Sequence, residues 1–522
     1  MIETATAHSE MDDEPVSPVP VAPGPVEGGT VEGGPVEGGP VEGGPFEGGT
    51  AESSVHAVPD GTASHDPDRP SALLEFMSTG WAPRADPLPE LHPAASFRAA
   101  RRRALARRFP GERLVIPSGG YVTRANDTEY RFRPGTEFFH LAGSAEPDAV
   151  LVVEADGTSV LYQAPVADRS TPGFFTDRMY GELWVGPRPS LEATSSLLGL
   201  QTRPLTELDG LSGKARVVRG YDTRVAGLFD SGADADAELR AFLSELRLVK
   251  DDHEVEQLQQ AVDATITGFE DVVRQLDRAK ATSERWIEGV FGLRARVEGN
   301  DVGYGSICAA GSHACTLHWT DNDGPVVDGD LVLLDMGVEG LELYTADVTR
   351  TLPVSGTFTP RQRQVYSLVL EAQEAGIAAC RPGADFLDPH RAAMQVLARG
   401  LVELGVLDDA EAALAEDAQL YRRYTLHGVS HMLGIDVHDC AHAREEVYRK
   451  GPLQAGFVLT VEPGLYFQVD DLTVPEDLRG IGVRIEDDVL ITEDGCRNLS
   501  AALPRTPDAI ESWMSALREE SA

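Results

Sequence analysis

The chain has 522 residues, 42% of them hydrophobic, and a formal net charge of -40. This length exceeds one ordinary hydrophobic core, so we expect two folded domains plus additional segments. The large negative charge argues against nucleic acid and against anionic membrane surfaces as partners.

The five cysteines are odd in number and scattered, without a CxxC pair. This usage is typical of free thiols in a reducing compartment, so a cytoplasmic location is expected. The sequence has no apolar run of about 18 residues and no basic segment before an apolar stretch at its start, so neither a membrane span nor a signal peptide is expected.

Residues 1–68 are expected to form a disordered acidic tail. The unit Pro-Val-Glu-Gly-Gly recurs from Pro25 to Gly49, and no lysine or arginine precedes Arg69. Such a composition buries too little apolar surface to offset the entropy of ordering. We interpret the tail as a solvated spacer, with a docking segment for a partner as the alternative.

Residues 69–250 are predicted to form an α/β domain. A basic helix is expected over 97–109, and from Arg113 to Val218 short apolar runs alternate with helix-like pieces. The glycines and proline of 181–188 predict a loop around Trp184. From the residues alone, this tryptophan is expected to pack in the core of its own domain.

Residues 251–505 are predicted to form an α+β domain, followed by a C-terminal helix or tail over 506–522. Apolar residues three and four apart predict a helix over 255–276, and a capping box of Thr359 and Gln362 predicts another through Ala379. A further helix is expected to open at Asp388. Strand-like stretches at 304–309, 331–335, 344–352, 457–462 and 481–492 predict a mostly antiparallel sheet.

Two aspartates dominate the stretch 331–351. One apolar run ends on Asp335, Gly337 and Gly340 interrupt it, and a second run carries Asp347. If the runs form an antiparallel hairpin, the two carboxylates point into one space, where they repel unless a proton or a cation lies between them. The alternative is a pair of strand-end aspartates that face water.

Histidines gather further along the chain. His318 stands alone, whereas His427, His431 and His438 lie within twelve residues. The spacing of four between the first two is that of a zinc-binding helix, but that motif requires Glu where Gly428 stands. Three clustered histidines still favour a functional site over three separate structural roles.

Two more acids end strand-like runs, Glu462 in 457–462 and Glu486 in 481–492, and Arg484 shares a strand face with Glu486. Glu462 and Glu486, together with Asp335, Asp347 and His431, provide four carboxylates and one imidazole. The four negative charges can balance two divalent ions. Oxygen-rich ligation favours a hard ion such as Mn²⁺. The sequence contains no Gly-x-Ser-x-Gly motif, three-glycine dinucleotide loop or phosphate-binding loop.

The stretches DMGVEGLELYTADVTRT, HGVSHMLGIDVHD, TVEPGLY and GIGVRIEDDVLIT resemble the Xaa-Pro aminopeptidases (aminopeptidase P), within the pita-bread dinuclear metallopeptidases. The resemblance covers roughly residues 95–505. It implies a creatinase-like α/β N-terminal domain, a pita-bread catalytic domain and two divalent metal ions per subunit, expected to be Mn²⁺.

The resemblance also implies residue roles. Asp335 would bind one ion, His431 with Glu462 the other, and Asp347 and Glu486 both. A second set, His318, His427, His438 and Tyr466, would line the substrate pocket. Arg484 would support Asp335, Glu462 would orient the water or take its proton, and Trp184 would reach the active site of a neighbouring subunit.

The implied activity is release of the N-terminal residue from peptides with proline second, by a homo-oligomer, dimer or tetramer. A prolidase, which shares the ligands but cuts only dipeptides, is the nearest alternative. A methionine aminopeptidase fits less well because it usually lacks the N-terminal domain. A pita-bread protein that only binds a partner stays open, although all five ligand positions are filled.

Overall fold

The computed structural model describes residues 69–521. The predicted tail of residues 1–68 lies outside the described residues. The first helix of the described part is α1 (Ser71–Met77). No helix in the described part of the chain combines the length and the apolar character needed to cross a membrane.

The first half of the described chain contains a five-stranded mixed sheet in the order β6-β5-β4-β1-β7. Alternate residues of the interior strand β1 enter two different cores: Leu114 and Ile116 join one, and Val115 joins the other. A strand with both faces buried needs elements on both sides of its sheet, and this confirms the predicted α/β architecture. The strands are β1 (Leu114–Pro117), β4 (Val150–Val153), β5 (Ser159–Gln163), β6 (Gln201–Pro204) and β7 (Arg216–Val217).

The helices of this region are α2 (Ala95–Arg108), α3 (Thr136–Ala142), α6 (Leu191–Leu198), α7 (Thr223–Leu228) and α8 (Ala233–Leu246), and a small hairpin is formed by β2 (Thr123–Ala125) and β3 (Thr128–Glu129). The basic helix expected over 97–109 is α2. Three of its arginines, Arg98, Arg101 and Arg102, are buried, and Arg101 pairs with Asp251 at 2.6 Å and Glu254 at 3.1 Å, at the start of α9 (Asp252–Arg274).

The surroundings of Trp184 differ from the prediction. The expected loop is one helical turn, α5 (Glu182–Val185), which follows α4 (Gly173–Thr176). Only glycine fits at the start of α5, because a Cβ on Gly181 would lie 2.3 Å from the carbonyl oxygen of Asp177. The core interpretation of Trp184 is wrong, since the side chain is 43% exposed, although its indole N–H donates to the Phe175 carbonyl at 2.8 Å.

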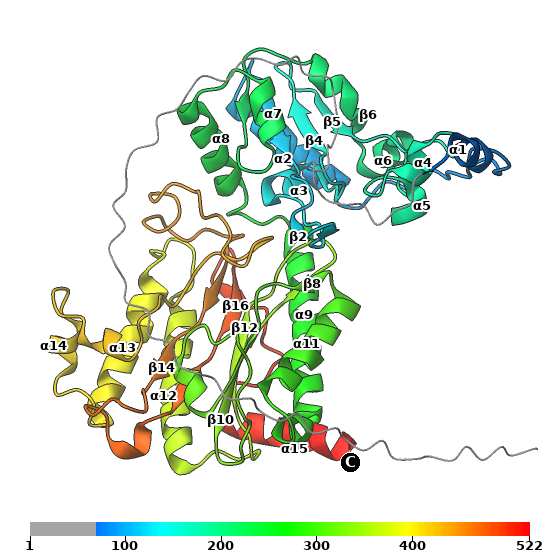
Figure 1. Ribbon diagram of the computed structural model, residues 1–522. Helices are drawn as coiled ribbons and strands as arrows, with labels where there is room; N and C mark the ends of the chain where they lie inside the picture. Colours follow the sequence, from blue (N-terminus) through cyan, green and yellow to red (C-terminus); the bar gives the residue numbers. More distant parts are fainter. Residues whose placement is uncertain (1–68, 522) are drawn as a thin grey trace, which may run out of the picture. The chain divides into compact units, whose positions relative to one another are not determined.

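The second half contains α9, α10 (Leu276–Lys280), α11 (Glu284–Glu298), α12 (Pro360–Ala379), α13 (Asp388–Glu403), α14 (Ala410–Leu414) and α15 (Pro507–Ser521). Both bonds of the predicted capping box between Thr359 and Gln362 are present at the start of α12. The helix predicted to open at Asp388 is α13. In Figure 1 these helices flank the central strands, with α9 and α11 on one side and α12 and α13 on the other.

The strands of this half pair antiparallel, as predicted for the α+β domain. They form two three-stranded sheets, β12-β10-β9 and β13-β16-β17, and two ribbons, β14-β15 and β11-β8. Their bounds are β8 (Asp301–Val302), β9 (Ile307–Ala310), β10 (Leu331–Met336), β11 (Val338–Glu339), β12 (Val348–Pro353), β13 (Val458–Val461), β14 (Gly464–Tyr466), β15 (Gly482–Arg484), β16 (Asp487–Ile491) and β17 (Cys496–Asn498).

Three predicted strands are shorter or interrupted. The stretch 481–492 is two strands, because β15 pairs with β14 whereas β16 pairs with β13, and Glu486 lies at the change of partner. The stretch 344–352 forms a continuous strand only from Val348, and before it Thr345 makes a single isolated bridge with Glu339. The stretch 304–309 joins its sheet only at Ile307.

Three of the four acids lie at such breaks or strand ends, whereas Asp335 lies inside β10. Glu462 separates β13 from β14, Glu486 separates β15 from β16, and Asp347 directly precedes β12. A buried ion pair links β12 to the start of β16. Arg350 of β12 donates to the Asp487 carboxylate at 2.7 Å and to the Glu486 carbonyl at 2.6 Å. Neither side chain of the pair is exposed to solvent.

Candidate active site

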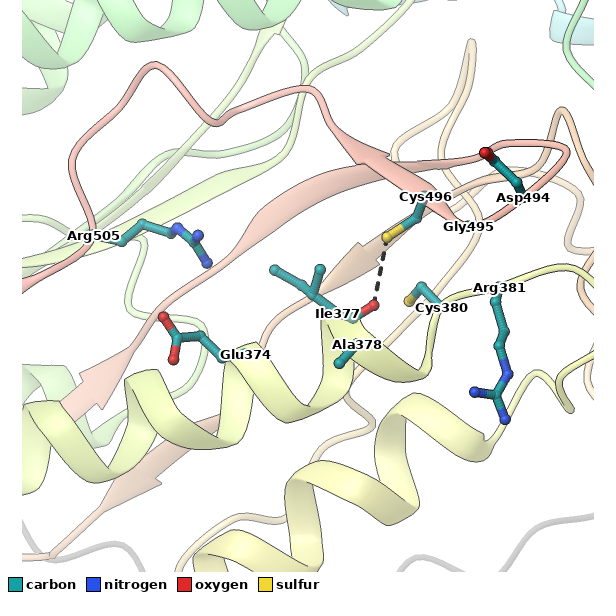
Figure 2. A pocket seen from close by; sticks show the side chains of 9 residues that line it. All are labelled: Glu374, Ile377, Ala378, Cys380, Arg381, Asp494, Gly495, Cys496 and Arg505. Atoms are coloured by element: carbon teal, nitrogen blue, oxygen red, sulfur yellow. Dashed lines mark hydrogen bonds between the residues drawn. The ribbon is translucent and has the colours of Figure 1, made fainter.

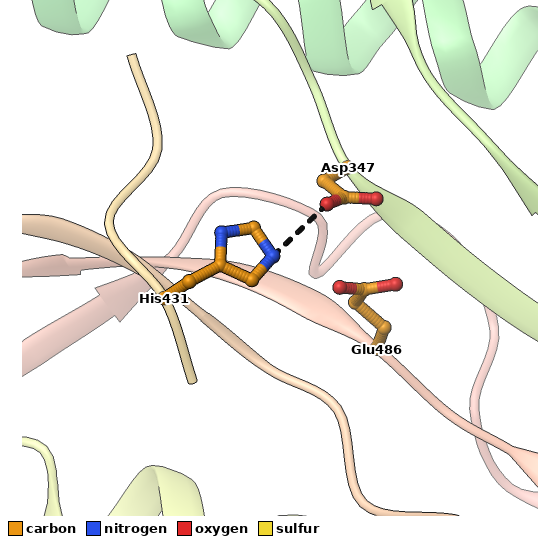
Figure 3. Close-up of side chains that lie close together, drawn as sticks. All are labelled: Asp347, His431 and Glu486. Carbon is orange, nitrogen blue, oxygen red and sulfur yellow. Dashed lines mark ion pairs between the residues drawn. The ribbon is translucent and has the colours of Figure 1, made fainter. Parts of the chain in front are cut away.

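Three potential metal-binding side chains converge at these breaks. One ligand atom each of Asp347, His431 and Glu486 lies within 4.8 Å of the others, and Figure 3 shows the three side chains pointing toward one another. Nε2 of His431 is 3.3 Å from Oδ2 of Asp347, while Nδ1 lies 3.2 Å from the Met432 carbonyl. A bond from Nδ1–H to that carbonyl leaves Nε2 as the ligand atom.

His431 and Glu462 are set in register by the backbone. The Thr460 N–H donates to the His431 carbonyl at 3.0 Å, and the Glu462 N–H donates to the Val429 carbonyl at 2.9 Å. The two side chains therefore meet, with Nε2 of His431 3.6 Å from Oε1 of Glu462.

The charges in this group strongly perturb its titration. Burial and the charge of Asp347 raise the pKa of Glu462 to about 7, although the charge of His431 opposes them. Burial alone would lower the pKa of His431, but its bond to Asp347 and the charge of Glu462 raise it to about 9. Burial, followed by the charges of Asp347, Glu462 and Asp335, raises the pKa of Glu486 well above its usual value.

Asp335 lies at the same centre and is oriented by two donors. Tyr304 donates to Oδ1 at 2.7 Å, and Arg484 donates to Oδ2 at 2.5 Å. The guanidinium of Arg484 is buried and also donates to the Tyr466 hydroxyl at 2.9 Å. Thr349 donates to Oε2 of Glu486 at 2.6 Å. The carboxylates of Asp335 and Glu486 are thus fixed in direction by neighbouring side chains.

The donor set fits divalent ions. Buried carboxylates that repel one another are stable only with protons or cations between them. Burial first, and then the charges of neighbouring carboxylates, raise the pKa values of Glu462 and Glu486, and a cation between these groups would favour their charged forms. Carboxylate oxygens with one imidazole nitrogen suit hard or borderline metal ions, and none of the five cysteines is among the ligands.

The remaining predicted histidines surround this group. Nε2 of His427 is 2.8 Å from the Tyr466 hydroxyl, and burial followed by the charge of Arg484 lowers the His427 pKa to about 4. The His438 ring packs edge-on against His431, with centroids 4.4 Å apart. His318 is exposed, and its charge is one of the influences that, after burial and His431, lower the pKa of His438.

Trp184 is the exception among the predicted residues. Its partners are the Phe175 carbonyl and the guanidinium of Arg178, whose Cζ lies 5.2 Å from the ring centroid. Within residues 69–521 it contacts none of the other ten predicted site residues.

Three participants were missed from the sequence. Tyr304 stands between Gly303 and Gly305, a setting that does not mark it as a partner of a carboxylate. Thr349 carried no signal of its own. Asp488 accepts the Asp347 N–H at 3.1 Å, and its other oxygen is buried without a protein partner. The run of three acids at 486–488 inside a strand-like stretch was the signal that could have identified Asp488.

A separate hollow of about 360 Å³ lies at the C-terminal end of α12 and the turn before β17 (Figure 2). Its lining includes the thiols of Cys380 and Cys496 and the side chain of Arg505, but none of the predicted site residues. Burial raises the pKa of both thiols, so both stay protonated and unreactive at neutral pH. This hollow therefore does not compete with the carboxylate cluster as a catalytic site.

Comparison with known families gives two matches along the chain. Residues 98–217 match the model described as "Aminopeptidase P, N-terminal domain", and residues 256–493 match "Metallopeptidase family M24". The Streptomyces coelicolor protein "Xaa-Pro aminopeptidase 1" is 58% identical over 457 residues, 85% of this chain and 92% of that protein. The Escherichia coli "Xaa-Pro aminopeptidase" is 34% identical over 452 residues, 80% of this chain and 98% of that protein.

Solved structures agree. Aminopeptidase P from Escherichia coli with the inhibitor Pro-Leu superposes with a TM-score of 0.72 at 32% identity, covering 82% of this chain and all of that one. An aminopeptidase from Pseudomonas aeruginosa gives the same TM-score at 29% identity. The α/β and antiparallel α+β regions are thus the N-terminal domain and the pita-bread domain of one known architecture, and the chain belongs to the aminopeptidase P family of M24 metallopeptidases.

Proposed function

We propose that this chain is a metal-dependent Xaa-Pro aminopeptidase, which releases the N-terminal residue from peptides that carry proline in the second position. The convergence of Asp347, His431 and Glu486 carries the proposal. It supplies the metal-binding group that such hydrolysis needs, in a chain whose similar relatives are named for this activity.

The family resemblance suggests which residues would hold the metals, and the grouping of Asp347, His431 and Glu486 supports it. Asp335 would hold one ion, His431 and Glu462 the other, and Asp347 and Glu486 would contribute to both. The oxygen-rich set favours Mn²⁺. Two such ions supply Lewis-acid chemistry, which lowers the pKa of bound water from 15.7 toward ~7 and polarises the scissile carbonyl.

Glu462 would orient the attacking water or take its proton, the role that the family resemblance assigns to it. Its Oε1 lies 3.6 Å from Nε2 of His431, so the carboxylate is at the centre where that water would be held. Arg484 holds Asp335 in position through its hydrogen bond to Oδ2.

The surrounding histidines are placed to handle the substrate. With a pKa of about 4, His427 is neutral at neutral pH and shares a hydrogen bond with the Tyr466 hydroxyl, which Arg484 fixes. His318 and His438 can donate hydrogen bonds to the developing oxyanion or protonate the proline nitrogen. A bond to proline needs its own pocket, because this tertiary amide lacks the N–H that other peptidases bind.

Further properties rest on the same resemblance. We expect a homo-oligomer, dimer or tetramer, in which the half-exposed Trp184 faces the active site of a neighbouring subunit. All five cysteines are free thiols, which supports a reducing, cytoplasmic setting.

Substrate length tests the proposal. Protein stripped of metal and then loaded with Mn²⁺ should release the first residue from Xaa-Pro-Xaa tripeptides and longer peptides, and should do so far more slowly with alanine in the second position. Cleavage of Xaa-Pro dipeptides alone would make the chain a prolidase. Binding of these peptides without any hydrolysis would make it a non-hydrolytic member of the fold.

A further inference from the structure

Glu284 is a completely buried carboxylate at the first position of α11, far along the chain from the metal ligands. Oε1 lies 2.7 Å from the Ala310 N–H and 2.9 Å from Nδ1 of His313. Oε2 accepts bonds from the Trp319 indole N–H at 2.9 Å and the Gly324 N–H at 2.7 Å. Each oxygen thus has two partners, which offsets the cost of burying the charge.

All four partners of Glu284 belong to one segment, residues 310–324, which carries His318. Residues 316–324 lie in no helix or strand, so regular backbone pairing does not hold the part of the segment around His318. Trp319, directly after His318, bonds to Glu284 and stacks on His313 with centroids 3.9 Å apart. Trp319 therefore faces inward, and His318 is exposed.

Close packing at Gly324 and side-chain hydrogen bonds of Asn322 fix the rest of the segment. Only glycine fits at position 324, since a Cβ there would lie 2.3 Å from the His313 ring and 2.9 Å from Oε2 of Glu284. Asn322 supplies a second anchor: it is buried, its amide oxygen accepts from the Cys308 N–H at 2.9 Å, and its NH₂ donates to the Ser306 carbonyl at 2.9 Å. His318 thus lies directly before Trp319, the first side-chain anchor, and four residues before Asn322, the second.

Helix α11 has other sources of stability. Its N-terminus is capped by Ser283, and Ile287, Val290 and Phe291 bury its apolar face in the main core. The four bonds accepted by the Glu284 carboxylate go to the His318 segment and none goes to the helix itself. Loss of this carboxylate should therefore affect the segment more than the fold of α11.

We propose that Glu284 is a positioning residue for His318, which clamps residues 310–324 so that His318 is held at the substrate side of the metal centre. The inference rests on the proposed function, in which His318 touches the peptide. Glu284 itself touches no substrate and acts through Trp319.

The test compares two tryptophans that each donate one indole hydrogen bond. Trp319→Phe removes the donor to Glu284 but keeps a ring to stack on His313. Trp286→Phe is the matched control, since Trp286 lies on the same helix α11 and donates to Gln275 at 3.2 Å, away from the segment. Trp319→Phe should lower kcat/KM for a tripeptide about tenfold, the effect of one lost hydrogen bond to a charged group. Trp286→Phe should leave kcat/KM near the wild-type value.

Repeating Trp319→Phe in the His318→Ala variant separates an effect on the positioning of His318 from an effect on general stability. Once His318→Ala has removed the positioned group, adding Trp319→Phe should lower kcat/KM no further, while the melting temperature still shows the effect of the second substitution. Equal proportional losses of kcat/KM in both backgrounds would overturn the proposal.

Hydrogen exchange provides a readout that does not depend on turnover. In the full chain, Glu284→Gln and Trp319→Phe should speed exchange across residues 311–324, whereas Trp286→Phe should not. Unchanged exchange in both variants would overturn the clamp whatever the enzyme cleaves. Failure of the wild type to cleave Xaa-Pro peptides, with faster exchange in the variants, would refute the proposed function and the role assigned to His318 but leave the clamp itself supported.

Discussion

Removal of the metal ions should make the stability of the protein fall as the pH rises through neutrality, and Glu462 should cause much of the fall. Burial raises its pKa from 4.5 to about 7 in the folded chain. A carboxyl with a raised folded-state pKa contributes stability below its unfolded pKa, and the contribution is lost as the pH rises through the folded pKa. This shift in the pKa of Glu462 corresponds to roughly 3 kcal/mol of unfolding free energy, and this stability is lost between about pH 4.5 and 7.

His431 acts in the same direction at higher pH. Its pKa is raised from 6.5 to about 9, so its contribution is present below 6.5 and is lost as the pH rises through 9. The two side chains face each other, so their contributions overlap. Mn²⁺ should remove most of the loss, because the ions neutralise the carboxylates and bind the unprotonated imidazole.

Urea unfolding in the presence of a chelator, from pH 5 to 9, measures this effect. Glu462→Gln is the control, because it keeps the shape of the side chain and removes the ionisation. The wild type should lose stability relative to this variant by roughly 3 kcal/mol across the range. If the two proteins show the same pH dependence without metal, the reasoning about a buried, metal-neutralised carboxylate is refuted.

Three further substitutions test separate parts of the account. Asp347→Ala should abolish turnover and reduce bound Mn²⁺ below two ions per subunit in metal analysis, and full activity would contradict the dinuclear site. Trp184→Ala should lower kcat/KM several-fold for tripeptides and less for Xaa-Pro dipeptides, because a stacking contact contributes ~1 kcal/mol. Equal losses of kcat/KM for both substrates, with a lower melting temperature, would show that the ring only packs on its own domain. Gly337→Ala should cost ~1–3 kcal/mol in urea unfolding, since its Cβ would lie 1.7 Å from the Ala346 carbonyl, whereas Gly340→Ala, with 3.4 Å to its nearest neighbour, should change little.

Local patterns predicted much of the architecture. The capping box of Thr359 and Gln362 placed the start of α12, and the apolar spacing over 255–276 predicted α9. The predicted hairpin around Asp335 is confirmed, because β10 and β12 pair antiparallel with Asp335 opposite Thr349. These features depend on neighbours in sequence or on one short connection, which a single chain reveals.

Features that depend on distant partners were missed. The stretch 481–492 is predicted as one strand although Asp487 interrupts the alternation of Ile481, Val483 and Ile485, and the change of partner from β14 to β13 depends on strands that are distant in sequence. Tyr304 meets Asp335 31 residues away, and Glu284 meets Gly324 40 residues away. In the sequence Glu284 resembles an ordinary acid in the first turn of a helix, so only the folded chain reveals its role.

A metal titration of peptide cleavage tests the central claim most directly. Metal-free protein would receive increasing Mn²⁺ while release of the N-terminal residue from an Xaa-Pro-Xaa tripeptide is followed. The account predicts no release in chelator and activity that saturates at two ions per subunit. Full activity in chelator, or no release at any metal content, would contradict it.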